Sequence, residues 1–524
     1  MFNKWCLDYP ARSQPALVNS PSLNTPSLAT AALVLLALIA PVIRADPLLS
    51  SWLTTNSTKY ARIYTSPANR TAGISTTTWT GQTSPTYAGI HEINYSATWV
   101  YLKNTGLGGY VMGPWNNPNL PKNQGTATKV FRFPRTPEIP ANKTLTGVGV
   151  IGVLVDGVSI YNTSDGFSYS TANGKDATPN GGIGPGDRIW NRDAWPNEFV
   201  SFDYALNHAQ PSGDYHSHAN PIAVRYQLGD NVTYNTATKV YSENTATTTY
   251  THSPIIGWMS DGLPYYGPYG YSSPLDATSP VRRMVSGYVF RDGSYGTTNL
   301  TSTGRTTLPA WALAAQNRAQ LNSSTQYGPA VNTAYALGHF SEDYDYLGDL
   351  GFTLGATSTV GAYTTLFDLN KYNVRFCVTP EFPSGTWAYF ATITSTGAPW
   401  YPYNAGRWYY GTKTAAASTT TVMAADTPLT QYYKGSASTA ETWTSAPVTP
   451  SGTNLTITWN AVEGGTYQVS ATSDLTTWTT LTPTVTATGA NTATFTETGA
   501  TATETKRFYK ITRTGLATFD AVGY

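Results

Sequence analysis

Short runs of alternating apolar and polar residues recur along most of the chain, bounded by Gly, Pro or Asn. The clearest case is residues 153–161, where two β-branched runs flank Asp156-Gly157. Asp-Gly between apolar runs is the strongest short-range signal for a β-hairpin. The same pattern predicts further strands at residues 222–228, 288–291, 374–378 and 387–393.

Helical periodicity is rare by comparison. One stretch begins near Pro309 and places Trp311, Ala314, Arg318 and Leu321 on a single stripe. Proline suits the first turn of a helix because its φ is already close to the helical value. The pattern as a whole predicts an all-β fold, mainly β with a few short helices.

The length of 524 residues indicates several domains, because single hydrophobic cores rarely grow beyond about 300 residues. Composition and patterning change at recognisable points along the chain. We expect a signal peptide, a polar N-terminal extension, a large β-rich domain, an Ala/Thr/Ser-rich linker and a small C-terminal β-sandwich, at residues 1–45, 46–89, 90–411, 412–450 and 451–524 respectively.

The first 45 residues have the pattern of an export signal. Lys4 and Arg12 precede an apolar run over residues 28–40, and Ala45 offers a small residue for cleavage. The run is shorter than the roughly 20 residues that a spanning helix needs, and no second run of that kind follows. The sequence predicts a secreted or cell-surface protein without a transmembrane span in the mature chain.

The C-terminal part has short alternating segments at the spacing of a sandwich domain. It resembles a fibronectin type III or immunoglobulin-like module, a type that usually serves as a spacer or attachment unit. Its predicted strands are residues 455–459, 467–472, 492–496 and 508–512.

Charge and cysteine content narrow the function classes. The formal net charge is +1 and only 12% of residues are charged, without the clusters of Lys and Arg that nucleic-acid binding requires. Beyond the leader, Cys377 is the single cysteine, so an intrachain disulfide is excluded. Strand alternation puts Cys377 opposite Phe376, and we expect a packed thiol rather than a reactive one.

Histidines supply the candidate chemistry, because four of the six lie between residues 208 and 252. His216 and His218 are two residues apart and would share one face of a strand. Imidazole is a ligand for Zn, Cu, Ni and Fe, so the sequence predicts a transition-metal site, with Zn and Cu as the leading candidates. The predicted ligands are His208, His216, His218 and His252.

Nearby carboxylates provide further ligand candidates, or partners that fix a histidine tautomer: Glu198, Asp203 and Asp261. The alternative is that the histidines are hydrogen-bonded in a polar core or lie in hydrated loops. The chain has no His-Glu-x-x-His motif, and its His-x-His lacks the downstream Glu of a cupin-like set. The sequence therefore predicts no particular reaction and leaves open whether the protein is an enzyme.

Tyrosines suggest a second function class. Tyr215, Tyr265 and Tyr266 are candidates for an aromatic surface that stacks on sugar rings. Their alternative role is to fill space between sheets, which is the commoner fate of aromatic side chains. A polysaccharide-binding surface module and a structural envelope protein are thus the rivals to the metal hypothesis.

Two blocks carry a resemblance to a known family. Residues 215–221, which read Tyr-His-Ser-His-Ala-Asn-Pro, and residues 252–271 resemble the two signature blocks of YHYH-domain proteins in order and spacing. Similarity extends over about residues 90–411, with Ser217 in place of the second Tyr of the signature. The resemblance implies a shared framework that includes all four predicted histidine ligands and Asp261; it implies no reaction.

Overall fold

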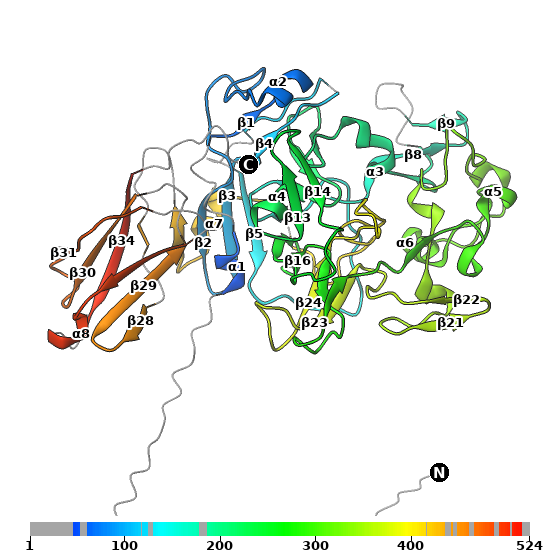
Figure 1. Cartoon of the computed structure of the whole chain (residues 1–524). Coiled ribbons are helices and arrows are strands. Elements are labelled where there is room, and N and C mark those ends of the chain that lie inside the picture. Colours follow the sequence, from blue (N-terminus) through cyan, green and yellow to red (C-terminus); the bar gives the residue numbers. More distant parts are fainter. Residues whose placement is uncertain are drawn as a thin grey trace, which may run out of the picture. The chain divides into compact units, whose positions relative to one another are not determined.

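Strands dominate the structure, a computed structural model (Figure 1). It describes residues 46–52, 60–116, 118–123, 129–177, 186–414, 417–434, 442–443, 448–460, 466–486, 492–503 and 506–515. The predicted signal peptide lies outside these residues. Within them, no helix combines the length and the apolar character needed to cross a membrane.

The largest sheet has eight strands and mixed direction. Two neighbouring pairs, β12 with β7 and β16 with β24, are parallel, and the remaining pairs are antiparallel. In spatial order the strands are β11 (Asn207–Ala209), β12 (Tyr215–Ser217), β7 (Ser159–Tyr161), β6 (Val150–Leu154), β15 (Ile255–Met259), β16 (Pro264–Tyr266), β24 (Thr386–Phe390) and β23 (Val374–Cys377).

The predicted Asp-Gly hairpin is confirmed as β6 and β7. Gly157 has a φ of 90°, a conformation that side chains with a Cβ rarely adopt, and this explains the glycine at the turn. All five residues of β15 are buried, so this strand is covered on both faces and is a continuous apolar run.

A second, five-stranded antiparallel sheet contains the strands β25 (Ala417–Thr419), β5 (Lys129–Pro134), β3 (Trp99–Asn104), β2 (Ile90–Tyr95) and β26 (Thr430–Lys434) in this order. The two edge strands come from the segment predicted as a linker. β25 pairs with β5 and β26 pairs with β2. These parts of residues 412–450 are therefore sheet, because short Thr- and Tyr-containing segments complete edges that the preceding domain leaves open.

Smaller sheets surround these two. One has three strands, β10 (Asn191–Asp193), β8 (Ser164–Ser170) and β9 (Lys175–Asp176). The two-stranded sheets are β1 (Arg62–Ile63) with β4 (Val111–Met112), β13 (Val232–Asn235) with β14 (Val240–Glu243), β17 (Tyr269–Tyr271) with β18 (Val281–Arg283), β19 (Tyr288–Phe290) with β20 (Tyr344–Tyr346), and β21 (Ser358–Val360) with β22 (Tyr363–Thr365).

The helices are short. The α-helices among the described residues are α1 (Pro47–Ser50), α2 (Pro67–Ala72), α3 (Ala194–Glu198), α4 (Ile222–Gln227), α5 (Leu300–Thr303), α6 (Ala310–Gln316), α7 (Thr420–Ala425) and α8 (Ala500–Thr503). The 3-10 turns are η2 (Phe199–Ser201), η3 (Ser294–Gly296), η4 (Ser324–Gln326), η5 (Ser341–Asp343) and η6 (Leu347–Leu350).

The described C-terminal residues form two further sheets. One contains β28 (Val448–Ser451), β29 (Asn454–Asn460) and β33 (Thr492–Glu497). The other contains β27 (Thr442–Trp443), β34 (Phe508–Gly515), β30 (Thr466–Thr472) and β31 (Thr479–Thr480), with β32 (Val485–Thr486) also paired to β30. All four strands predicted here are confirmed, whereas the likeness to a fibronectin or immunoglobulin module stays a prediction.

One predicted strand is wrong. Most of this range, Ile222–Gln227, forms the helix α4, in which Ile222, Val224 and Arg225 are buried. A short apolar run has no periodicity that separates a strand from a buried helical turn, and tertiary contacts decided the outcome. The helix predicted near Pro309 begins there as α6, but it ends earlier than expected because Asn317 adopts a left-handed conformation.

Cys377 is packed as predicted. It is 2% exposed, while Phe376 on the opposite face of β23 is 40% exposed. Burial raises the pKa of the Cys377 thiol to about 11, so the thiol is protonated and inert at neutral pH.

Candidate metal centre

A small hairpin brings three histidines together. His208 on β11 and His216 on β12 occupy directly opposed positions in the antiparallel register. His218 lies two residues after His216, so its side chain projects toward the same face. Gly213 closes the turn between the strands with a φ of 87° and donates its N–H to the Gln210 carbonyl.

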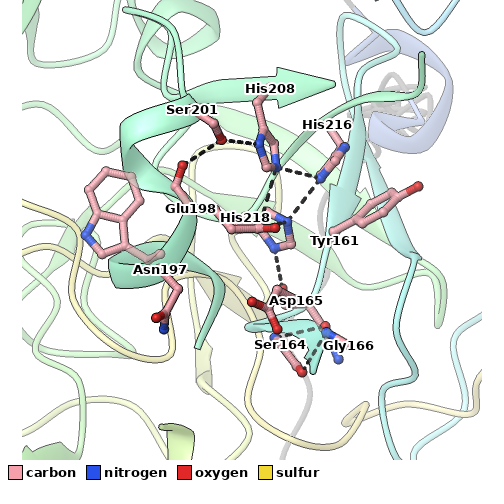
Figure 2. Close-up of polar contacts among 12 residues, drawn as sticks. Tyr161, Ser164, Asp165, Gly166, Asn197, Glu198, Ser201, His208, His216 and His218 are labelled. Atoms are coloured by element: carbon pink, nitrogen blue, oxygen red, sulfur yellow. Dashed lines mark hydrogen bonds and ion pairs between the residues drawn. The ribbon is translucent and has the colours of Figure 1, made fainter. Parts of the chain in front are cut away.

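The three imidazoles converge through the same ring atom (Figure 2). The Nε2 atom of His216 lies 3.0 Å from Nε2 of His208 and 3.0 Å from Nε2 of His218. All three ligand atoms lie within 4.8 Å of one another, and all three residues are buried. This arrangement fulfils the central expectation that His216 and His218 share a face.

Hydrogen bonds fix the tautomers of two of these rings. Nδ1 of His216 lies 2.9 Å from the Asp214 carbonyl oxygen, and Nδ1 of His218 lies 2.6 Å from the Asn162 carbonyl oxygen. A carbonyl oxygen only accepts, so each Nδ1 carries the hydrogen. In the neutral ring, Nε2 then presents a lone pair toward the centre.

Ser201 fixes the third ring. Its hydroxyl donates to the Glu198 backbone carbonyl oxygen at 2.6 Å. The Ser201 hydroxyl oxygen also lies 2.7 Å from Nδ1 of His208. With its single hydrogen used, the hydroxyl can only accept from His208, so Nδ1 of His208 also carries a hydrogen. All three Nε2 lone pairs therefore face one another.

The short contacts between Nε2 atoms are consequently not hydrogen bonds between neutral rings. Burial lowers the pKa of His216 to about 4 and that of His218 to about 3. The pKa of His208 is also lowered, mainly by burial and to a smaller extent by charge repulsion from His216 and His218. At neutral pH the rings are uncharged, and none of the three Nε2 atoms carries a hydrogen of its own.

Glu198 adds an oxygen to the same point. It is the last residue of α3, a helix whose N-terminus is capped by Asp193. Its Oε2 atom lies 3.4 Å from Nε2 of His218 and 3.6 Å from Nε2 of His208. This oxygen is buried and, among the described residues, lacks a hydrogen-bond partner. Burial, and then the nearby Asp165, raises the pKa of Glu198 to about 8.

Aromatic rings pack against two of the imidazoles. Tyr161 on β7 stacks on His216 with ring centroids 3.9 Å apart, and Phe202 packs edge-on against His208 at 4.4 Å. The cluster lines a cavity of about 530 Å³, together with Tyr161, Glu198 and Ser201. The ring positions are therefore restrained while one side of the centre opens into free space.

His252, the fourth predicted ligand, is not part of this cluster. It precedes β15, and two strands, β7 and β6, separate β15 from β12 in the sheet. Its Nδ1 donates to the Ser253 carbonyl at 2.8 Å, and its ring packs against Tyr271 at 4.8 Å. Of the four predicted ligands, the structure brings His208, His216 and His218 together and leaves His252 apart.

The two aspartates among the predicted candidates have other partners. Asp203 accepts hydrogen bonds from the Gly113 N–H and the Tyr215 hydroxyl, so it anchors the residue before His216. Asp261 accepts from the Tyr389 hydroxyl and the Gly411 N–H. Neither carboxylate contacts a ring of the cluster in the described structure, and only Asp203 supports it, through Tyr215.

The predicted aromatic surface is not present at these residues. Tyr215, Tyr265 and Tyr266 are at most 1% exposed, so none can stack on an external ligand. Tyr265 and Tyr266 lie on β16, which is flanked by β15 and β24 in the sheet. Their hydroxyls form hydrogen bonds within the protein. Tyr266 donates to Glu381 at 2.9 Å, and Tyr265 donates to the Tyr403 carbonyl oxygen. The space-filling alternative is the correct one.

Three supporting residues escaped prediction: Ser201, Asn162 and Tyr161. Asn162 acts through its backbone carbonyl, which any residue possesses, and Tyr161 acts through ring stacking. Ser201 lies seven residues before His208, and no local motif links the two. Such contacts leave no signal in a single sequence.

Comparison with known proteins assigns the chain to a family. The family model described as YHYH protein matches residues 130–403, just over half of the 524 residues. The chain belongs to the YHYH protein family. The matched region contains the whole histidine cluster with Glu198 and Ser201, and it is shorter at both ends than the predicted domain of residues 90–411. No match was found among curated proteins or solved structures.

Proposed function

We propose that the YHYH domain binds a divalent transition metal through Nε2 of His208, His216 and His218, with the Glu198 carboxylate as a fourth ligand. The observation that carries this proposal is the convergence of three Nε2 lone pairs and one unpartnered carboxylate oxygen on a single buried point. Four electron-rich atoms repel one another unless a cation lies between them.

The distances suit such an ion. Zinc–nitrogen bonds are about 2.0 to 2.1 Å long. Two nitrogens at that distance are about 3.0 Å apart for a right angle at the ion and about 3.4 Å apart for a tetrahedral angle. The 3.0 Å separations of His216 Nε2 from the other two Nε2 atoms, and the 3.4 Å from Glu198 to His218, fall in this range. The 3.6 Å from Glu198 to His208 lies just above it. The carbonyl and hydroxyl partners of the three Nδ1 atoms are the outer contacts that metal-bound histidines usually make.

A proton is the competing cation. Glu198 with its raised pKa can carry one proton and donate it to one Nε2 atom. The other two histidines would still face each other with lone pairs, and their lowered pKa values oppose further protonation. A single metal ion accepts all four donors at once, so metal binding is favoured over a proton-bridged cluster.

The cavity beside the centre determines whether a bound ion could reach a substrate. Three imidazoles and one carboxylate leave room for a further ligand on the side of the cavity of about 530 Å³. An accessible ion of this kind can polarise a substrate oxygen or lower the pKa of bound water, and a redox-active ion can exchange electrons. A catalytic role is therefore compatible with the donor set, and the identity of the metal decides the reaction class.

Elemental analysis tests the proposal directly. Full-length protein purified without chelator and without an affinity tag that contains histidine is expected to hold about one equivalent of Zn, Cu, Ni or Fe. The His208→Ala variant removes a ligand at the sheet edge and should hold less than a tenth of an equivalent. His252→Ala is the matched control, because this histidine lies outside the cluster and its loss should leave the metal content unchanged.

Two outcomes would overturn the proposal. One is wild-type protein that stays metal-free after dialysis against each of the four ions. The other is equal metal content in wild type and His208→Ala, provided that circular dichroism shows both to be folded.

We also propose that the mature protein is exported. The support is the basic and apolar pattern of the first 45 residues. Mass spectrometry of protein expressed with its leader should find an N-terminus at Asp46 in the extracytoplasmic fraction, and an intact N-terminus in the cytoplasm would contradict export.

A further inference from the structure

A second cavity adjoins the metal centre. It has a volume of about 430 Å³ and shares three lining residues, Val148, Ser164 and Gly166, with the cavity that the histidines line. Ser164 and Gly166 lie close to His218 (Figure 2). The two spaces therefore meet along one stretch of chain, and a ligand can extend from one into the other.

Two arginines line this second cavity without a carboxylate partner. Within the described residues, the Arg188 guanidinium has no hydrogen bond or ion pair, although the backbone N–H of Arg188 donates to the Ser168 hydroxyl. The Arg407 guanidinium donates to one group, the Thr146 carbonyl oxygen. Most of the ten N–H groups that two guanidiniums carry are thus available.

Several other arginines of the domain are paired with carboxylates, although Arg283 donates instead to the Ile393 carbonyl oxygen. Five other arginines each have a carboxylate within 4.0 Å: Arg192 with Asp165, Arg225 with Asp230, Arg282 with Asp368, Arg291 with Asp345 and Arg305 with Asp343. Arg188, which is exposed, and Arg407, which is half-buried, line the cavity without such a pair.

Glu342 is the acidic residue of this cavity, and its charge is already engaged. Its carboxylate accepts hydrogen bonds from the Asn191 N–H, the Asn191 side chain and the Gln316 side chain. Burial raises the pKa of Glu342 to about 7, so its carboxylate is only partly charged at neutral pH. Arg407 opposes this increase in the pKa of Glu342, and the cavity wall carries two guanidiniums beside this one carboxyl group.

We infer that this second cavity binds a carboxylate or phosphate group of an extended ligand whose other end reaches the metal centre. Guanidinium groups bind such anions through paired, charge-assisted hydrogen bonds. The inference deepens the proposed function, because it takes the metal centre as the far end of the ligand site. It predicts that the ligand is a chain molecule with an acidic group, such as an acidic oligosaccharide or a phosphorylated chain.

The residues shared by the two cavities define a passage between them, and this passage allows a second test. Gly166 has a φ of 86°, and a Cβ on this residue would lie 3.7 Å from a methyl group of Val148. Val148 is 68% exposed, so a larger side chain can be placed there without disturbing the core. A bulky residue at position 148 should narrow the passage and leave both ends intact.

Calorimetric titrations of the full-length protein with trigalacturonate, tripolyphosphate and neutral maltotriose test the inference. Wild type is expected to bind one of the two acidic probes at least ten times more tightly than maltotriose, and the preferred probe separates a carboxylate-bearing from a phosphate-bearing ligand. Arg188→Gln and the double variant Arg188→Gln/Arg407→Gln should raise the Kd of that probe stepwise, the double variant by at least tenfold. Lys506→Gln, which removes an exposed charge outside the family match, is the control and should bind as wild type does.

The titrations are run on metal-free and on zinc-loaded protein, so that the two proposals can fail separately. Arginine-dependent binding by metal-free protein supports the anion site even where elemental analysis finds no metal. Equal affinity of wild type and the double variant, or no acidic probe bound above the level of maltotriose, overturns the anion site whatever the metal content.

Val148→Trp tests the continuity of the two cavities. It is expected to retain its metal and its affinity for inorganic phosphate, and to bind the preferred three-unit probe at least fivefold more weakly. Unchanged affinity for that probe would show that the ligand does not run through the passage.

Discussion

The Arg225 cluster and the histidine cluster are both buried and polar, but they differ in how their charges and hydrogen-bonding groups are balanced. In the first, Arg225 lies between Asp230 and Glu243, and its guanidinium also donates to Asn220. The acidic partners accept further hydrogen bonds, including one from Ser253 to Asp230 at 2.8 Å. Every charge in this cluster therefore has an opposite charge beside it.

The histidine cluster lacks this internal balance. Its three Nε2 atoms are acceptors, and the Oε2 atom of Glu198 beside them has no partner among the described residues. The ring N–H groups point outward, to the Asp214 and Asn162 carbonyls and to Ser201. The difference separates a polar cluster whose charges balance one another from one for which we propose a bound cation. A buried cluster of donors and acceptors stabilises the chain alone, whereas a cluster of acceptors alone requires a cation.

The largest expected effect comes from removing the positive charge of the Arg225 cluster. Arg225→Met should lower the free energy of unfolding by about 3 to 5 kcal/mol, because it leaves Asp230 and Glu243 buried without their counter-charge. Denaturant titration followed by tryptophan fluorescence measures the change. Arg135→Met is the control, since the pair that it breaks with Asp46 is far more exposed and should contribute about 1 kcal/mol or less. Equal losses in the two variants would remove the distinction.

Metal removal acts on the other cluster. With free metal at 100 to 1,000 times its Kd, chelation should lower the free energy of unfolding of wild type by about 3 to 4 kcal/mol. His208→Ala should show no response to chelator, because the site that links metal binding to folding is gone. A chelator response of equal size in this variant would place the bound metal elsewhere.

Ser201→Ala tests the outward-pointing hydrogen bonds. Without the hydroxyl, His208 loses the partner that fixes its tautomer, and metal affinity should fall by about 10- to 100-fold. Competition with a chromophoric chelator measures the change. Ser201→Thr keeps the hydroxyl and should bind metal within about threefold of wild type, so equal weakening of both variants would assign Ser201 a packing role.

The smallest effect concerns a single buried acid. Asp156 at the β6–β7 turn accepts from the Val158 N–H, while its Oδ2 has no partner among the described residues. Burial raises its pKa to about 7. The folded state therefore holds a proton that the unfolded chain releases, and this contribution to stability is lost as the pH rises from about 4 through 7.

Asp156→Asn removes that titration. Between pH 6 and pH 8 wild type should lose about 1.4 kcal/mol more stability than the variant. Parallel stability curves over this pH range would show that Asp156 does not carry the pH dependence.

Much of the fold was predictable because its signals are local. The Asp-Gly hairpin and the C-terminal strands follow from alternation and turn residues, which act within a few positions. The failures fall where distant contacts decide. Ile222–Gln227 form a helix that contains the buried Arg225, and residues 417–419 and 430–434 become strands because β5 and β2 offer them an edge.

The candidate site divides in the same way. The sequence by itself determined that His216 and His218 share a face, because side chains alternate along an extended strand. Only the tertiary structure decided that the register sets His208 opposite His216, that the sheet keeps His252 away, and that α3 delivers Glu198. Local geometry is written in the spacing of residues, whereas the meeting of separate strands and helices depends on packing across the whole domain.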